Sequence, residues 1–151
     1  NKVVKNLKTM GMSLKPCTVF TTGKESFEIA DDEVEIGLGI HGEPGTHREK
    51  MTTANKFTEK LFEKVYAESN AQKGDRFAIL VNGLGETTLI ELFIINNHLQ
   101  DLLKGKEVEV TKTLVGNYMT SLDMGGFSIT LLKLDKEMEE LLNAEEDTIA
   151  F

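Results

Sequence analysis

The succession of patterns between residues 77 and 114 constrains the fold more than any other feature of the sequence. Residues 77–81 form a continuous apolar run, which is typical of a strand covered on both faces. Residues 88–103 begin with the spacing of a capping box and continue as a long apolar helix, and residues 108–114 alternate like a strand. A strand, a helix and a strand in this order predict a right-handed crossover, and hence a sheet with helices packed against it.

Shorter patterns on either side complete this architecture. Apolar residues recur at helical spacing over residues 53–69, and Asp135 can cap a last short helix. Further strands are predicted from alternating or apolar runs at residues 17–22, 26–30, 34–40 and 127–131. The early strands have no helices between them, so we expect a mixed sheet. The predicted fold class is α+β, a two-layer sandwich with a mixed β-sheet and helices packed on it.

The start of the chain suggests that it belongs to a larger protein. The first residue is Asn1 rather than Met, and the first ten residues place lysines among apolar residues in the pattern of an amphipathic helix. We therefore expect residues 1–12 to form a helix that ends, or links to, a missing N-terminal domain. Residues 13–151 are expected to form one domain, because a chain of 151 residues suits a single core of ordinary size.

Composition argues against two classes of partner. The formal net charge of −8, without a cluster of Lys and Arg, is the opposite of what the binding of nucleic-acid phosphates requires. No apolar run approaches the length that spans a bilayer, so we expect no membrane segment. The single cysteine, Cys17, cannot form an internal disulfide, which favours a cytoplasmic location.

One histidine is the main candidate for chemistry. His41 follows the predicted strand at residues 34–40 and is flanked by glycines, which let a ligand approach the backbone closely. A neutral imidazole is nucleophilic, and Glu43 is near enough in sequence to orient it. The residues alone fit equally well a surface-turn histidine that is hydrogen-bonded to a carboxylate. They give neither Glu43 nor Thr46 a defined step.

Two glycine-rich segments resemble nucleotide-binding motifs. Residues 37–42 match the spacing of a dinucleotide fingerprint, but Pro44 and Gly45 follow where its helix should begin. The turn at residues 82–87 is a better candidate for a phosphate cradle, and it would support a nucleotide-binding domain of tubulin-like type. It has no P-loop lysine, and we favour an ordinary strand-to-helix turn.

The remaining reactive residue types are interpreted as structural. Ser121 and Asp123 fall in an expected glycine-rich turn between two strands. Cys17 is expected to be a small buried hydrophobe rather than a reactive thiol. His98 lies on the predicted long helix without a partner at metal-ligand spacing, and we expect no metal site.

Three segments together resemble the second domain of the bacterial substrate-binding subunit of dihydroxyacetone kinase. They are residues 35–45 (EIGLGIHGEPG), residues 80–92 (LVNGLGETTLIEL) and residues 120–135 (TSLDMGGFSITLLKLD). Their order and spacing also fit, and the resemblance covers nearly the whole chain. In that family the histidine of the first segment bonds covalently to substrate. The resemblance therefore implies that His41 is the catalytic anchor, which holds dihydroxyacetone as a hemiaminal for phosphorylation.

The resemblance also implies what lies outside the chain. In the family, a glycine-rich segment, a histidine and an aspartate that assist phosphoryl transfer belong to the preceding domain, so we expect the isolated fragment to be inactive. This chain is expected to hold no cofactor, because ADP or ATP with magnesium is bound by a separate L subunit. In bacteria a phosphoenolpyruvate-dependent phosphocarrier commonly recharges that nucleotide. A homodimer is also implied. The alternative is a ketone-binding coactivator paralogue that regulates transcription.

Overall fold

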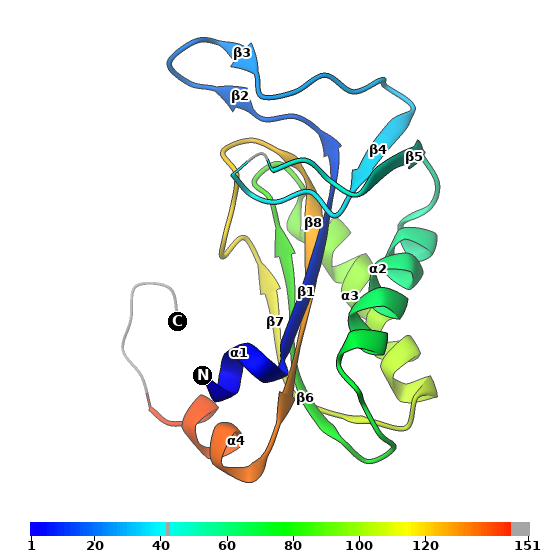
Figure 1. Cartoon of the computed structure of the whole chain (residues 1–151), viewed down its shortest axis with the longest axis vertical. Helices are drawn as coiled ribbons and strands as arrows, with labels where there is room; N and C mark the ends of the chain where they lie inside the picture. Colours follow the sequence, from blue (N-terminus) through cyan, green and yellow to red (C-terminus); the bar gives the residue numbers. More distant parts are fainter. Residues whose placement is uncertain (42, 146–151) are drawn as a thin grey trace.

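The computed structural model describes residues 1–41 and 43–145, and it contains one six-stranded sheet with helices packed against it (Figure 1). The strands of this sheet are β1 (Leu7–Lys15), β4 (Glu33–Ile36), β5 (His47–Lys50), β6 (Arg76–Gly83), β7 (Glu109–Gly116) and β8 (Gly125–Leu134). The helices are α1 (Lys2–Asn6), α2 (Ala54–Glu68), α3 (Leu89–Gly105) and α4 (Lys136–Leu142). A two-stranded ribbon of β2 (Thr18–Val19) and β3 (Lys24–Glu25) projects beyond one end of the sheet.

The sheet is mixed, with the strand order β5-β4-β1-β8-β6-β7. Strands β6 and β7 are parallel and are joined through α3, whereas the other neighbouring pairs are antiparallel. The crossover and the mixed α+β fold class predicted from the sequence are therefore confirmed.

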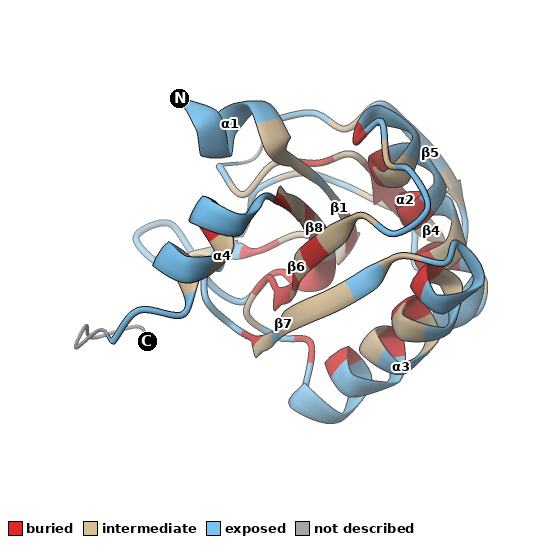
Figure 2. Ribbon diagram, turned by 90° about the horizontal axis from the view of Figure 1, so that it is seen from below, coloured by how far each residue is buried: buried red, intermediate tan, exposed pale blue. Residues whose placement is uncertain are grey.

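Helices α2 and α3 lie side by side on one face of the sheet and bury their apolar stripes against it (Figures 1 and 2). The hydroxyl of Thr53 caps α2 by accepting the Lys56 N–H. At the start of α3, the Glu91 carboxylate accepts the N–H and the hydroxyl of Thr88 at 2.9 and 2.7 Å, as the capping-box spacing predicted. The fully buried side chains between helices and sheet include Met12, Leu61, Phe62, Phe77, Leu92, Leu99, Ile129 and Leu131. Each of these contributes about 1.5–3 kcal/mol of apolar burial.

The beginning of the chain differs from the sequence prediction. Helix α1 ends at Asn6, so the helix expected over residues 1–12 is wrong in its second half. The rest forms β1, which pairs with β4 on one side and β8 on the other. Its pattern suits a strand, because Met12 is fully buried while Gly11, on the opposite face, weakens a helix. The boundary drawn between residues 12 and 13 falls inside this strand.

Three early strands also differ from the prediction. The strand expected over residues 34–40 ends at Ile36, because Gly37 has a φ of +81°, which leaves the extended region. Of the strand expected at residues 17–22 only β2 forms, and the strand expected at residues 26–30 is wrong, because β2 pairs instead with β3, which lies before those residues. Strand β5 was not expected at all, because its sequence His-Arg-Glu-Lys contains no apolar residue and it occupies the edge of the sheet.

Candidate functional site

His41 lies in the loop of residues 37–46, which joins the antiparallel strands β4 and β5. Two hydrogen bonds close the base of this loop. The N–H and the hydroxyl of Thr46 both donate to the carbonyl oxygen of Ile36, at 2.7 and 3.1 Å. The two ends of the loop are therefore joined to each other where β4 ends and β5 begins.

A buried carboxylate holds the returning side of the loop. Glu35 accepts the Gly45 N–H at 2.7 Å and the Nε–H of Arg48 at 3.3 Å. A Cβ on Gly45 would lie 2.7 Å from Cγ of Glu35, so the close approach requires glycine. The side chain of Glu35 is 10% exposed, and its charge is paired with that of Arg48.

The outgoing side of the loop is attached to β1 and to a second apolar cluster. The N–H of Gly37 donates to the carbonyl oxygen of Gly11 at 2.7 Å. Leu38 and Ile40 pack into this second cluster rather than into the main core, and Leu38 is buried there. The other members of the cluster are Cys17, Phe27, Leu84 and Met124. The backbone that leads to His41 is therefore fixed by packing on one side and by hydrogen bonds on the other.

The imidazole of His41 projects into solvent, with 80% of its side chain exposed. Its Nδ1 lies 3.1 Å from Oε1 of Glu43, and its backbone N–H donates to Oε2 of the same carboxylate at 3.0 Å. Among residues 1–41 and 43–145, no group forms a hydrogen bond with Nε2 of His41. With a proton on Nδ1 facing the carboxylate, the lone pair on Nε2 is free to attack an electrophile.

Glu43 is poised to accept these hydrogen bonds as an anion. Its pKa lies below the ordinary glutamate value, chiefly because its own backbone N–H bonds the carboxylate. The backbone N–H and the imidazole of His41 lower the pKa further, and partial desolvation opposes them. The carboxylate is therefore ionised at neutral pH, which favours a proton on the neighbouring Nδ1.

A groove of about 790 Å³ lies beside the loop. It runs between residues 37–40, the part of β1 that β4 does not pair with, and a face of β6 and β8 that includes Leu80 and Ser128. Its surface is mostly apolar. The segment that leads directly to His41 thus forms one wall of this groove.

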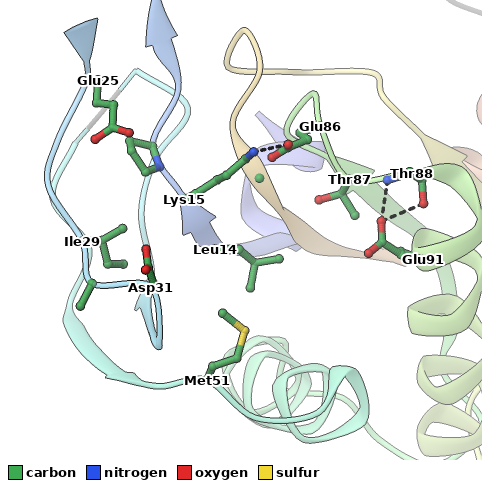
Figure 3. Close-up of a pocket in the computed structure, with 13 residues that line it drawn as sticks. Leu14, Lys15, Glu25, Ile29, Asp31, Met51, Glu86, Thr87, Thr88 and Glu91 are labelled. Atoms are coloured by element: carbon green, nitrogen blue, oxygen red, sulfur yellow. Dashed lines mark hydrogen bonds and ion pairs between the residues drawn. The ribbon is translucent and has the colours of Figure 1, made fainter.

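A second cleft, of about 590 Å³, lies at the start of α3 and is lined by charged and polar groups together with apolar ones such as Leu14, Ile29 and Met51 (Figure 3). Lys15 forms an ion pair with Glu86 there, and Glu91 is bonded to Thr88. Glu25 and Asp31 also line this cleft. Acidic side chains outnumber Lys15 at this surface, which makes it a poor site for an anion such as a phosphate.

The turn at residues 82–87 borders this second cleft, and two of its N–H groups are bonded to a neighbouring segment. The N–H of Leu84 donates to Gly126 at 3.2 Å, and the N–H of Glu86 donates to Met124 at 3.1 Å. The hydroxyl of Thr87 both donates to the Gly126 carbonyl and accepts the Gly126 N–H. A phosphate cradle needs free N–H groups, whereas these bind the neighbouring strand. This agrees with the interpretation as a strand-to-helix turn.

The other histidines are bound to neighbours away from the loop tip. Nδ1 of His47 lies 2.9 Å from the hydroxyl of Thr46, at the start of β5. His98 joins α3 to α2, because its Nε2 lies 2.8 Å from Oε1 of Glu59. In the described part of the chain, no three His, Cys, Asp or Glu side chains are grouped so that they could hold a metal ion. No helix of that part is long and apolar enough to cross a membrane.

Ser121 and Asp123 do not form a nucleophile–carboxylate pair. The hydroxyl of Ser121 is buried against the thiol of Cys17 at 3.8 Å, and Cys17 is buried as expected. Asp123 accepts the Thr18 N–H at 2.6 Å, and this bond is the main reason that its pKa is lowered. Both residues therefore fasten the ribbon of β2 and β3 to the body of the fold.

His41 stands out in the sequence as a candidate, whereas the residues that hold its loop do not. Glu35 alternates with core residues and looks like a solvent-facing position of a strand, yet it is buried by the returning loop. Thr46 closes the loop through its backbone N–H and its hydroxyl, which every threonine has, so the sequence gives no sign of this role. The spacing of Glu43 suggested a contact with His41, and the structure shows that contact.

Comparison with known proteins shows which family the chain resembles. A family model described as the Dak1 domain matches residues 1–150. The chain is 47% identical over 151 residues to the dihydroxyacetone-binding subunit of a PTS-dependent dihydroxyacetone kinase 1 from Listeria innocua. This match covers 99% of the chain and 46% of the relative.

Two solved structures share the fold. A dihydroxyacetone kinase operon co-activator, Dha-DhaQ, superposes with a TM-score of 0.83 at 40% identity, over 92% of this chain and 43% of that one. The native dihydroxyacetone kinase of C. freundii superposes with a TM-score of 0.76 at 27% identity, over 95% of this chain and 26% of that one. The chain spans less than half of the length of each of these proteins.

Proposed function

The chain belongs to the Dak1 domain family, and from this membership we propose that it is the ketone-binding part of a dihydroxyacetone kinase, with His41 as the covalent anchor. The observation that carries the proposal is the state of the His41 ring. The ring is exposed at the tip of a closed loop, one nitrogen faces a carboxylate, and the other nitrogen has no bond within the described residues. A nucleophile needs this combination of fixed position and free lone pair.

The proposed reaction is an addition without loss of water. Nε2 of His41 forms a bond to C2 of dihydroxyacetone, the π bond of the carbonyl breaks, and its electron pair moves to the oxygen. The oxygen then gains a proton while Nδ1 loses one, so the product is a neutral hemiaminal with the full mass of the ketone. A compound such as glycerol has no carbonyl and cannot be captured, so the chemistry itself selects the substrate. Acid should weaken capture, because a protonated imidazole has no free lone pair.

The phosphorylation step would depend on groups outside this chain. We propose that the rest of the protein supplies the glycine-rich segment, the histidine and the aspartate that assist phosphoryl transfer, and that this chain alone is inactive. ADP or ATP with magnesium would be held by a partner L subunit, which a phosphoenolpyruvate-dependent phosphocarrier recharges. The product would be dihydroxyacetone phosphate, made for glycerol and glycerone metabolism. The same resemblance supports a cytoplasmic homodimer.

Carbon NMR of dihydroxyacetone labelled at C2 tests the anchor in the full-length protein. The labelled carbon should move from the ketone region to that of a carbon with four single bonds, and the intact protein should gain the mass of one ketone. His41→Ala should abolish both signals while leaving the circular dichroism spectrum unchanged, because the exposed ring supports little core. His98→Ala, at a histidine on α3 away from the loop, should retain both signals. Capture by the His41→Ala protein, or an adduct on a lysine, would exclude the assignment.

A second candidate function is that of a ketone-binding coactivator of transcription. It is favoured by the superposition on the co-activator Dha-DhaQ, whose TM-score and identity exceed those of the C. freundii kinase. His41 would capture the ketone in either case. The two functions are separated by supplying the full-length protein with dihydroxyacetone and a nucleotide-loaded L subunit. Formation of dihydroxyacetone phosphate identifies the kinase, and capture without phosphorylation identifies the coactivator.

A further inference from the structure

The carboxylate of Glu43 contacts both the backbone and the ring of His41. One oxygen accepts the backbone N–H of His41 at 3.0 Å, and the other lies 3.1 Å from Nδ1 of its ring. A single hydrogen bond would leave the ring free to turn about its side-chain torsions. Because the Glu43 carboxylate is also hydrogen-bonded to the backbone of His41, it defines both the orientation of the ring and the nitrogen that carries the proton.

Gly39 provides the space that this carboxylate occupies. A Cβ at position 39 would lie 2.8 Å from Cδ of Glu43, in contact with the far end of the side chain rather than with backbone. The N–H of Gly39 also donates to the carbonyl oxygen of Glu43 at 3.3 Å, so the two residues face each other across the loop. A methyl group at position 39 would displace the carboxylate without altering any polar group.

We propose that Glu43 is the positioning residue of the anchor, which holds the proton on Nδ1 of His41 and turns the lone pair of Nε2 outward, and that Gly39 is needed to admit its carboxylate. The effect of Glu43 on ketone capture rests on the proposed function. The positioning of the His41 ring does not, because it is a property of the protein without ketone. During addition to a ketone, positive charge develops on the imidazole, and the nearby anion stabilises it before the Nδ1 proton is lost.

Nitrogen NMR of labelled histidine tests the positioning in the full-length protein without any ketone. At a pH where the imidazole is neutral, the two ring nitrogens of His41 should give the separate signals of a protonated Nδ1 and an unprotonated Nε2. Glu43→Gln and Gly39→Ala should both move these signals toward a mixture of tautomers. Glu28→Gln and Gly105→Ala serve as controls, because Glu28 is exposed outside the loop and a Cβ on Gly105 meets no atom within 4 Å. Unchanged signals in both loop variants would overturn the proposal.

The rate of ketone capture provides the second measurement. Glu43→Gln and Gly39→Ala should slow capture by roughly tenfold to hundredfold, the usual cost of losing a group that orients a functional histidine. Agreement between the two variants matters, because Gly39→Ala leaves the carboxylate in the molecule and changes only its place. Capture at an undiminished rate by both variants would overturn the role of Glu43. If the unmodified protein captures no ketone, the proposed function fails, and the NMR signals still decide whether Glu43 positions the ring.

Discussion

Removal of the Glu35 carboxylate should loosen the loop that carries His41. The bond from Gly45 to this buried carboxylate is charge-assisted and short, at 2.7 Å, and such bonds contribute about 1.5–3 kcal/mol. Arg48 is 45% exposed, so its pairing with Glu35 should add less than about 1 kcal/mol. Glu35→Ala is therefore expected to destabilise the closed loop by about 2–4 kcal/mol, most of it from the bond to Gly45.

Hydrogen exchange followed by mass spectrometry measures this change directly. In Glu35→Ala, the amides of residues 37–46 should exchange about thirty- to a thousandfold faster, which is the exchange equivalent of that free energy. Glu35→Gln keeps an oxygen for Gly45 and should show a smaller increase. Glu33→Gln on the same strand is the matched control, because Glu33 is 30% exposed and its oxygen lies 3.6 Å from Lys50. Equal exchange in the Glu35→Ala and Glu33→Gln proteins would refute the role given to the buried carboxylate.

Acid unfolding and one glycine offer two further tests. The pKa of Asp75 is lowered, first by the Lys133 side chain, so its stabilising effect is complete above pH 3.8 and is lost as the pH falls through its lower folded-state pKa. Asp75→Asn should remove this acid-dependent loss from a curve of stability against pH, and an unchanged curve would contradict the assignment. Gly85 has a φ of +134°, and its Cβ would lie 2.9 Å from the carbonyl carbon of Leu122. Gly85→Ala should therefore lower the unfolding free energy by roughly 2–5 kcal/mol in urea titrations. Gly105→Ala is the control and should change it little, and an equally small change in Gly85→Ala would contradict the prediction.

The elements that could be predicted from the sequence are those whose pattern is local and complete. The Thr88–Glu91 spacing marks the start of α3 because the Glu91 carboxylate accepts both the N–H and the hydroxyl of Thr88 within one turn. Strand β1 could not be predicted, because three lysines at helical spacing open the chain and the decisive contacts are to β4 and β8, far along the sequence. Strand β5 has no apolar residue, and it exists because the loop before it returns to Ile36.

The candidate site divides in the same way. His41 could be located because its type and its flanking glycines are visible in the sequence, and its contact with Glu43 spans two residues. The burial of Glu35 depends on where the loop lies after it has closed, and ten residues separate it from Gly45. A pattern of alternating residues gives no sign of such a contact, because both a solvent-facing glutamate and a buried one fit the same position.

Two glycine-rich segments leave strands in this chain, and the destinations of their hydrogen bonds explain why only one is a candidate for chemistry. In the turn at residues 82–87, the N–H groups of Leu84 and Glu86 and the hydroxyl of Thr87 bind residues 124–126. In the loop of residues 37–46, the backbone is anchored at Gly37 and Thr46, near its two ends. Between these anchors, the His41 imidazole keeps one nitrogen without a hydrogen bond to any described residue. Glycine spacing is similar in both segments and cannot distinguish them, whereas the side chain that each segment leaves exposed can.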